Sequence, residues 1–532
     1  MPEIRTPPPS FSMDPAYKHW QTFGVERRVL VVARTVTTVT RLLDVLSLFE
    51  DDPRVQPFFT FDGLNPAIFS AGLPEFLHSL GTTVVPWAEA VKPGFDLAIA
   101  ASENDNLAEL PSPVLLIPHG IGHQKYYPRT EIVSGLNPSR LHGDRLRLGL
   151  SHGNQLRHLD GDAPPTVVIG DPCHDRMLAS AHRVPHFRRL LGADSRTHVV
   201  LASTWGPDSL IGADHLVPQR FLAELPLDEY RVSLVLHPAV WSAHSPFQVR
   251  AALAAAIRGG LTVIPPQHGW QATLLSADCV VSDCGSMPLY ATAAGVPVII
   301  GSPVSDTVVT GSPLAELLAK APQLVRSDLT SQISAAIAAG PVPGVADQAV
   351  EYPGKCAEIL RPLLYSMLGL SEPTRPAVFP PVEDPAPQVR QPATFRVSVH
   401  NEGTALAITR FPAAVPHTGE PLPGTHVVAH AELSTLPDLE GAAVIHRDRT
   451  DDFPAWAAET ARRRPDARLI AATAPGRCLI RTKDGTTTTL SAPPEVDPLA
   501  IASAAYWHVV RNLPLTTLRF RLGNHLITAK AD

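Results

Sequence analysis

The chain of 532 residues contains 44% hydrophobic residues, 18% charged residues and 55 prolines, and its formal net charge is −7. A chain of this length is too long to pack around one hydrophobic core, which predicts about three domains. The acidic balance, without a long block of Lys or Arg, excludes a general nucleic-acid binder. The five cysteines are scattered and form no CxxC pair. They indicate neither a disulfide framework nor a zinc site and are typical of a reducing compartment.

The sequence contains no run of about 18 apolar residues, the length that crosses a membrane, and residues 1–20 lack the apolar region of a secretion signal. We therefore expect a cytoplasmic protein. Peripheral contact with the cytoplasmic face of a membrane stays open, because such contact needs no spanning segment.

Short apolar runs alternate with helical patterns after an N-terminal tail at residues 1–25. The runs lie at 27–34, 55–61, 82–87, 95–102 and 113–120, and the helical patterns lie at 38–50 and 67–81. This alternation predicts a parallel sheet with helices on both faces. We assign residues 26–165 to this first Rossmann-like domain.

The same pattern repeats after a loop that is rich in His and Arg. The second set of apolar runs lies at 166–170, 198–204, 230–238, 261–265, 279–283 and 296–302, with helical patterns at 174–192 and 246–260. We assign residues 166–372 to a second Rossmann-like domain. Two doubly wound α/β domains of this kind enclose a cleft.

Residues 373–393 are rich in proline and poor in apolar residues, which predicts an extended linker. Beyond the linker, residues 394–532 predict a small α+β accessory domain. Its strand-like runs lie at 394–399, 405–411, 425–433, 441–447 and 467–474, and its helical patterns lie at 453–464 and 498–513. This region contains no recognisable chemical motif.

The segment VVSDCGSMPLYATAAGVPVII (280–300) predicts a strand, a tight turn, a helix and a second strand. A turn that opens a helix at the carboxyl end of a parallel strand favours an anion. Gly285 permits close approach of a ligand to the backbone, and the Ser286 hydroxyl can donate to a phosphate. Asp283 and Ser286 are also common helix-capping residues, so ordinary capping is the alternative interpretation.

Two further strands end in histidine, at His119 and His237. Histidine exchanges protons near neutral pH. One histidine in each domain therefore suits a general base for one substrate and a hydrogen-bond donor to the phosphate of the other substrate. Thr204 ends another strand, where its hydroxyl is placed to touch a donor phosphate.

These segments resemble the motif series of the CDP-glycerol glycerophosphotransferase family, whose members make teichoic-acid-like polymers on a GT-B fold. The resemblance covers about residues 110–305 and is carried by HGIGHQK (119–125), GDPCHDRML (170–178), LASTWGPDSL (201–210), LVLHP (234–238) and CVVSDCGSMPLYATAAGVPVII (279–300). It implies that the first domain (26–165) lies on the acceptor side and that the second (166–372) binds the donor nucleotide. It also implies that His119 is the general base, that His237 helps to hold the donor pyrophosphate, and that Asp283 and Ser286 bind donor phosphate.

The sequence also departs from the family pattern. Lys125, a residue expected to contact acceptor or phosphate, follows His119 by six positions rather than five, and Gly122 replaces the proline of the family motif. In the phosphate turn, Cys284 and Gly285 replace Tyr and Ser. The turn therefore also resembles the SDSGG turn of UDP-sugar transferases and UDP-GlcNAc 2-epimerases.

We therefore predict a GT-B transferase that uses a nucleotide-diphosphate donor, CDP-glycerol-like in the first instance, and a hydroxyl-bearing acceptor such as a lipid-linked one. We expect neither a cofactor nor a metal. Two alternatives remain, a UDP-sugar glycosyltransferase or epimerase-like enzyme, and a non-catalytic nucleotide-binding or scaffold protein. The sequence leaves the oligomeric state open.

Three features of the sequence carry less weight. His142, His152 and His158 lie in the Arg-rich stretch 140–158, which is either a solvated loop or part of an acceptor channel. His268 or Trp270 is placed to approach a nucleotide base. Asp175, near the start of a helix, is expected to stabilise that helix and to position a hinge.

Overall fold

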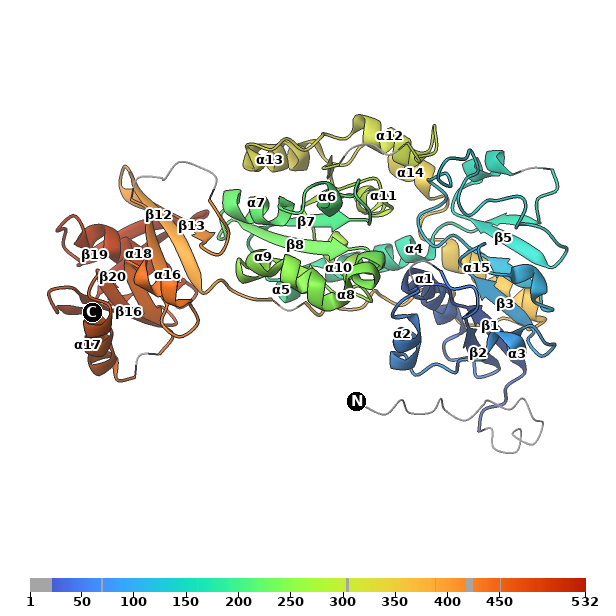
Figure 1. The fold of residues 1–532 in the computed structure, drawn as a ribbon, viewed down its shortest axis with the longest axis horizontal. Coiled ribbons are helices and arrows are strands. Elements are labelled where there is room, and N and C mark those ends of the chain that lie inside the picture. The colour runs from blue at the N-terminus through green and yellow to red at the C-terminus, as the bar shows by residue number, and fades with distance from the viewer. Residues whose placement is uncertain are drawn as a thin grey trace.

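The computed structural model describes residues 22–67, 70–159, 161–302, 306–387, 389–417, 424–449 and 451–532, so the predicted N-terminal tail lies outside the described residues up to residue 21. Figure 1 shows three units in a row, with the first sheet domain at one end, the second in the middle and a closed barrel at the other end. The predicted fold class is confirmed, since two doubly wound parallel-sheet domains precede a unit of mixed strands and helices.

The first sheet has six parallel strands in the order β2-β1-β3-β4-β5-β6. The strands are β1 (Arg27–Val32), β2 (Val55–Thr60), β3 (Leu97–Ala100), β4 (Val114–Leu116), β5 (Leu146–Leu150) and β6 (Thr166–Val168). The helices around this sheet are α1 (Val36–Leu46), α2 (Leu73–Ser79), α3 (Trp87–Ala90) and α15 (Cys356–Leu368). Short 3-10 turns lie at η2 (Ser47–Phe49), η3 (Leu107–Glu109) and η4 (Gly153–His158).

One face of the first sheet is covered by helices from distant parts of the sequence. α1 begins with a capping box at Thr35 and turns Leu42 towards the sheet, where Leu42 packs in one cluster with Val31 and with Leu364 of α15. α15 lies in the range 166–372 that the sequence assigns to the second domain, yet its apolar face completes the core of the first domain. The first domain is therefore discontinuous in sequence.

Two strand predictions at the edges of the first domain differ from the structure. The run 166–170 was expected to begin the second domain, but β6 pairs with β5 and forms the edge of the first sheet. β5 itself lies inside the polar stretch 140–158, where its exposed Arg147 interrupts the apolar pattern. The run 82–87 forms no strand, because Pro86 lacks an N–H group and only Val84 makes a bridge, to Phe59.

The second sheet has five parallel strands in the order β11-β10-β7-β8-β9. Its strands are β7 (Thr197–Ser203), β8 (Tyr230–Leu236), β9 (Thr262–Ile264), β10 (Cys279–Ser282) and β11 (Val298–Ile300). The helices of this domain are α4 (Pro172–Ala179), α5 (Val184–Leu191), α6 (Leu210–Ala213), α7 (Val217–Glu224), α8 (Pro238–Ala252), α9 (Ala254–Arg258), α10 (Trp270–Leu275), α11 (Met287–Ala293), α12 (Pro313–Lys320), α13 (Leu329–Ala339) and α14 (Val345–Ala349). The strand order reverses between β7 and β10, which makes their carboxyl ends the topological switch point, where α/β folds bind ligands.

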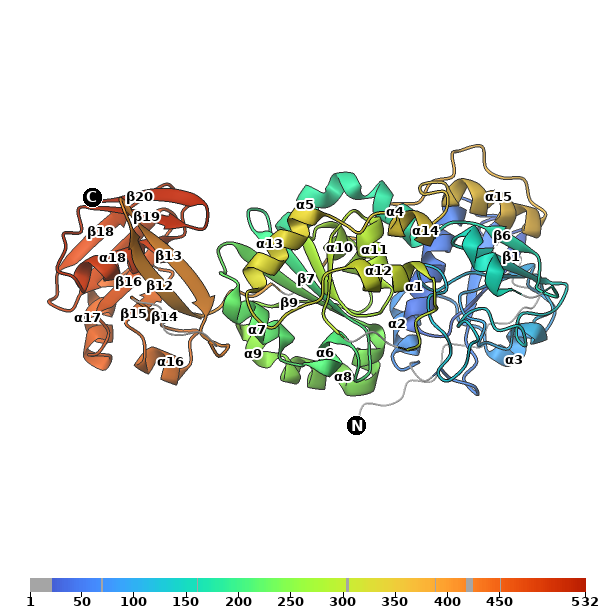
Figure 2. The ribbon, with the colours of Figure 1, turned by 90° about the horizontal axis from the view of Figure 1, so that it is seen from above.

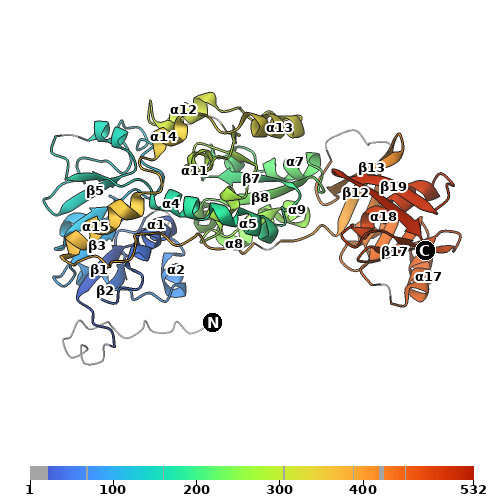
Figure 3. The same cartoon turned by 180° about the vertical axis from the view of Figure 1, so that it is seen from behind.

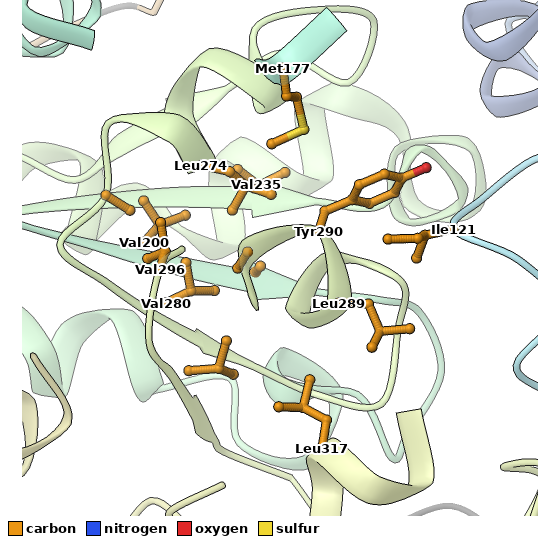
Figure 4. Close-up of a cluster of buried hydrophobic side chains, with 14 of the residues drawn as sticks. Ile121, Met177, Val200, Val235, Leu274, Val280, Leu289, Tyr290, Val296 and Leu317 are labelled. Carbon is orange, nitrogen blue, oxygen red and sulfur yellow. The ribbon is translucent and has the colours of Figure 1, made fainter. Parts of the chain in front are cut away.

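A large apolar cluster joins α10 and α11 to the second sheet. Figure 4 shows Val200, Val235 and Val280 from the strands beside Leu289 and Tyr290 of α11. Ile121, from the loop after β4 of the first domain, belongs to the same cluster and is fully buried. The two sheet domains therefore share part of one core.

The chain passes from the first domain to the second and back at one place, where Figure 2 shows α4 and α14 between the two sheets. Gly170 has a φ of +75°, and a Cβ at this position would lie 2.8 Å from the Glu351 carbonyl oxygen. Asp175 accepts hydrogen bonds from the Gly354 and Cys356 N–H groups, each at 2.8 Å. Asp175 thus ties the outgoing segment to the returning one.

The C-terminal unit is a closed barrel in the order β12-β13-β19-β20-β18-β17-β16-β15-β14. Its strands are β12 (Thr394–Glu402), β13 (Ala405–Pro412), β14 (His426–His430), β15 (Val444–Arg447), β16 (Leu469–Ala474), β17 (Arg477–Thr482), β18 (Thr487–Ser491), β19 (Thr517–Leu522) and β20 (His525–Ala531). α16 (Leu436–Glu440) and α17 (Phe453–Arg463) accompany it. α18 (Pro498–Val509) contacts β12 and β13 as well as β16 and β17, so it fills the interior. Its run of small residues, such as Ala502 and Ala504, is buried on all sides.

The predicted linker forms no helix or strand over its described residues, but it is not free of contacts. Figure 3 shows it running along the second domain to β12. Phe379 packs in the core cluster of the first domain, and Val382 packs in that of the second. The Val382 N–H donates to Ser180 Oγ at 2.8 Å, and Arg183 donates to the Val382 carbonyl oxygen at 2.8 Å. We call residues 379–384 the strap.

The barrel also contacts the second domain directly. Arg410 of β13 is buried, and its Nε donates to Asp228 Oδ2 at 2.9 Å while its Nη1 donates to Asp497 Oδ2 at 2.6 Å. Val415, in the loop after β13, is 1% exposed and belongs to a core cluster of the second domain.

Among the described residues, no helix has the length and apolar character needed to cross a bilayer.

We expect a fragment that ends at residue 387 to be more stable than one that ends at residue 372. The shorter fragment loses the strap and exposes the surface that Phe379 and Val382 cover, at a cost of roughly 1.5–3 kcal/mol for each side chain. Urea denaturation of both fragments measures the difference in the free energy of unfolding. Both fragments lack Arg410 and Val415, which controls for loss of the barrel. Equal stabilities would contradict a stabilising strap, and failure of both fragments to fold would show that Val415 is needed to complete the second domain.

Candidate functional site

A cavity of about 330 Å³ lies between the carboxyl ends of the two sheets. Loops that follow β4, β7, β8 and β10 contribute to its wall. The structure brings all the predicted site residues except Asp283 to the lining of this cavity, namely His119, Lys125, Thr204, His237, Gly285 and Ser286.

Asp283 is fully buried and lies behind the turn at residues 283–286, which the sequence predicts to bind phosphate. Its Oδ2 accepts from the Thr204 N–H at 2.8 Å and from the Leu210 N–H at 2.9 Å, and its Oδ1 accepts from the Gly285 N–H at 3.1 Å. These bonds tie the end of β10 to the end of β7. Since its oxygens face backbone N–H groups, the place of Asp283 is to position the turn rather than to contact a ligand.

Gly285 and Ser286 form the part of the turn that faces the cavity. A Cβ at Gly285 would lie 2.2 Å from Thr204 Cγ2, so the close approach of Thr204 requires glycine here. Ser286 is exposed to the cavity and precedes α11, and its hydroxyl makes no capping hydrogen bond. Ser286 and Thr204, which both carry a hydroxyl, therefore line the cavity at the switch point.

His237 caps α8 from the end of β8. Its Nδ1 accepts the Ala239 N–H at 3.1 Å, so in the neutral ring the proton is on Nε2. Burial lowers the pKa of His237 to about 4, with further lowering from His119 and from the Lys125 ammonium. His237 is therefore neutral near pH 7 and has one N–H group to donate.

His119 follows β4 on the first-domain side of the cavity. Its side chain is accessible within the cavity, but surrounding protein lowers its pKa, and the positive charge of Arg41 lowers it further. A hydrogen bond to the Ala101 backbone opposes this shift. A neutral imidazole with one nitrogen committed to a backbone carbonyl keeps a lone pair on the other nitrogen, as a general base requires.

Lys125 places a positive charge in the cavity wall. Its Nζ lies 3.8 Å from Cys284 Sγ, so it reaches across from the first domain to the phosphate turn. Its backbone makes a bridge to Val308 of the second domain. The changed motif spacing thus still brings this lysine to the cavity.

Arg41 of α1 is the main site residue that the sequence did not indicate. Its guanidinium is buried and donates to Asp171 Oδ1 at 3.2 Å, to Asp44 Oδ2 at 3.5 Å and to the Tyr290 hydroxyl, which in turn donates to Asp171 Oδ2 at 3.0 Å. Burial alone would lower the pKa of Arg41, but Asp171, Tyr290, Cys173 and Asp44 together outweigh burial and the pKa is raised. We call Arg41, Asp44, Asp171 and Tyr290 the interdomain network. A single Arg within an amphipathic helix gave no signal of this role.

Aromatic and histidine side chains complete the wall. Trp270 lines the cavity and packs against Tyr290 with ring centroids 5.3 Å apart, whereas His268 faces a different cavity beside α2. His123 also lines the site, and its Nδ1 lies 3.0 Å from the Ser134 carbonyl oxygen. The motif HGIGHQK contains His123, but the family pattern drew attention to His119 instead.

The other histidines of the Arg-rich stretch lie outside this cavity. His142 is exposed, and His152 accepts the Asn154 N–H at 3.0 Å to cap η4. Arg157 donates to the Gly311 carbonyl oxygen at 2.9 Å. Among the described residues, none of His142, His152 and His158 lines the cavity between the sheets.

Comparison with known proteins gives a likeness of fold only. No protein-family model matches the sequence, and no curated protein matches it. Solved structures that resemble the chain include the wall teichoic acid polymerase TagF, with 12% identity and a TM-score of 0.40 over 65% of this chain and 89% of that one. The UDP complex of S. aureus MnaA has 11% identity and a TM-score of 0.40, over 66% of this chain and 100% of that one. The UDP-GlcNAc 2-epimerase of Methanocaldococcus jannaschii has 13% identity and a TM-score of 0.40, over 64% and 99%.

The lowered pKa of His237 predicts a pH dependence of stability. The unfolded chain takes up a proton on this histidine below about pH 6.5, whereas the folded protein does so only near pH 4. The free energy of unfolding should therefore fall as the pH falls through this window. His237→Asn removes the titrating group, so its urea-denaturation stability should decline less steeply with pH than that of the wild type. His142→Asn, at an exposed position, is the control. Parallel curves for the wild type and His237→Asn would contradict the assigned shift.

Proposed function

We propose that this chain is a transferase that moves a glycerophosphate-like or glycosyl group from a nucleotide-diphosphate donor to a hydroxyl-bearing acceptor. CDP-glycerol-like donors are favoured by the motif order, and a lipid-linked or surface-polymer end is the acceptor that this resemblance implies. The observation that carries the proposal is the shared cavity, to which the first domain contributes His119 and Lys125 and the second contributes His237 and Ser286.

In this proposal, His119 removes the proton from the acceptor hydroxyl as its oxygen attacks the donor. The lowered pKa of His119 keeps the ring unprotonated near pH 7, which is the state that accepts a proton. For a glycerophosphate donor, the new bond forms between the acceptor oxygen and the phosphorus that carries glycerol. The bond to the nucleoside monophosphate breaks, and its electron pair leaves with that monophosphate.

The second domain holds the donor phosphates. The neutral His237 ring donates its Nε2–H, and the hydroxyls of Ser286 and Thr204 are further donors at the switch point. Lys125 adds a positive charge beside the same turn. Donors and a cation that face the leaving phosphate stabilise the charge that develops on it. Trp270 and the neighbouring Pro265 offer apolar surface to the base of the nucleotide.

Cytidine diphosphate compounds should stabilise the protein against heat more than uridine compounds do. A ligand present at 100 times its dissociation constant adds about 2.7 kcal/mol to the free energy of unfolding, which a thermal melt resolves. The panel contains CDP-glycerol, CDP, UDP-glucose and UDP-GlcNAc, with ATP as a control nucleotide. Stabilisation by UDP-sugars alone would replace the CDP donor with a UDP-sugar donor. Binding without any turnover on hydroxyl acceptors would favour the non-catalytic alternative.

Replacement of His119 should separate proton transfer from donor binding. We expect His119→Ala to lower kcat by roughly 10²- to 10⁴-fold with donor affinity almost unchanged, because a general base acts in the transition state. His237→Ala should instead weaken donor binding, turnover or both. His142→Ala, outside the cavity, should behave like the wild type. Near-normal turnover of His119→Ala at saturating acceptor would show that another group, such as His123, is the base.

A further inference from the structure

A second cavity lies where the barrel meets the second sheet domain, far from the site described above. Its volume is about 1,020 Å³. Its charged lining carries more acids than bases, with Asp228, Asp448, Glu495 and Asp497 against Arg196 and Arg410. Such a surplus of carboxylates in a concave site favours a cation.

Three potential metal ligands converge on one wall of this cavity. His430 ends β14 and stands opposite His446 in the register of β14 and β15, and Asp448 follows β15. One ligand atom from each residue lies within 4.8 Å of the others. His430 Nε2 is 3.4 Å from Asp448 Oδ2, and His446 Nδ1 is 3.7 Å from Asp448 Oδ1. Ligands bonded to one tetrahedral metal at about 2.0–2.2 Å are roughly 3.3–3.6 Å apart, and Asp448 lies at about this spacing from each histidine.

The imidazole of His446 has no partner of its own. The residue is 3% exposed, and among the described residues neither ring nitrogen has a hydrogen-bond partner. Buried polar atoms in folded proteins are nearly always paired, so two orphaned nitrogens in a cavity wall point to a ligand.

Hydrogen bonds from neighbouring groups orient the other two residues. Thr473 Oγ1 donates to Asp448 Oδ1 at 3.1 Å, which orients the carboxylate in the way that outer-shell groups orient metal ligands. His430 Nδ1 accepts the Glu432 N–H at 3.1 Å and the Leu433 N–H at 3.3 Å, which directs Nε2 towards Asp448. Ligation through Nε2 moves the ring proton to Nδ1, so the turn at residues 432–433 must release these two bonds when the metal binds.

We propose that His430, His446 and Asp448 bind one divalent transition-metal ion, Zn²⁺ in the first instance, with its remaining position open to the cavity. Two imidazoles and one carboxylate match zinc and its neighbours rather than Ca²⁺ or Mg²⁺, which prefer ligands made of oxygen alone. Three protein ligands leave a fourth tetrahedral position for water or for a group of a molecule bound in the cavity. This site is independent of the proposed transferase cavity.

The test is a calorimetric titration of Zn²⁺ into the full-length protein after removal of metals with EDTA, with Mg²⁺ as the comparison ion. We expect one Zn²⁺ per chain and no comparable Mg²⁺ binding. Asp448→Asn, whose side chain is 70% exposed, should fold normally and lose at least roughly tenfold in Zn²⁺ affinity, because it removes a ligand. Glu495→Gln is the matched control, an exposed acid of the same cavity that is not a ligand, and should bind like the wild type.

A second variant separates a metal site from a packing histidine. His446→Leu keeps a side chain of similar size and removes the two orphaned nitrogens, so the metal-free protein should melt at the same temperature or higher while Zn²⁺ binding is lost. In the wild type, Zn²⁺ should speed amide hydrogen exchange at residues 432 and 433. Absence of stoichiometric Zn²⁺ binding, equal loss in Asp448→Asn and Glu495→Gln, or wild-type binding by His446→Leu would each overturn the proposal.

Discussion

The interdomain network is the constraint on which the rest of the site depends. It places the guanidinium of Arg41, from the first domain, against Asp171 at the start of α4 and against Tyr290 on α11 of the second domain. A buried charge is costly unless it is paired, so these groups hold one relative position of the two sheets. That position sets the distance across the cavity between His119 and the phosphate turn. The same guanidinium also helps to keep His119 unprotonated.

The cavity combines neutral imidazoles with fixed positive charge. His119 and His237 both have lowered pKa values, so each offers one function near pH 7, a lone pair or an N–H group, rather than a mixture of protonation states. Lys125 supplies charge instead. Asp283 is the one carboxylate at the turn, and backbone N–H groups occupy its oxygens, so it adds no repulsion towards a phosphate at the cavity surface. The arrangement fits an anionic ligand.

The alternating pattern of apolar runs was sufficient to predict both parallel sheets, because buried strands between helices leave a strong periodic signal. The pattern failed where contacts between distant segments decide which sheet a strand or helix joins. β5 contains Arg147 and gave no apolar run, and β6 is too short to show which sheet it joins. α15 reads as an ordinary amphipathic helix, and no local signal states that it returns to the first sheet. Four barrel strands, β17 to β20, lie in polar or short stretches that gave no apolar run, and the barrel closes through the distant pairs β13–β19 and β18–β20.

The sequence likewise predicted the cavity-lining residues at strand ends but missed those that depend on contacts between distant segments. Residues at strand ends converge because parallel strands end at one edge, so His119, His237, Thr204 and Ser286 were found from the sequence. Arg41 and Tyr290 lie within helices and become site residues only through contacts between domains. His430, His446 and Asp448 were missed for a related reason, since the two histidines are neighbours only across paired strands.

The discontinuous first domain has a consequence for how the chain folds during synthesis. Its sheet is complete in sequence at residue 168, but the face that α15 covers stays open until residue 368 has been made. At about 5–20 residues per second, the intervening stretch of about 200 residues takes roughly 10–40 s to synthesise. The second domain, by contrast, draws its whole sheet from one continuous segment. The sheet of the middle unit can therefore form before α15 closes the unit that precedes it in the sequence, whereas Val382 and Val415 join the core of the middle unit later still.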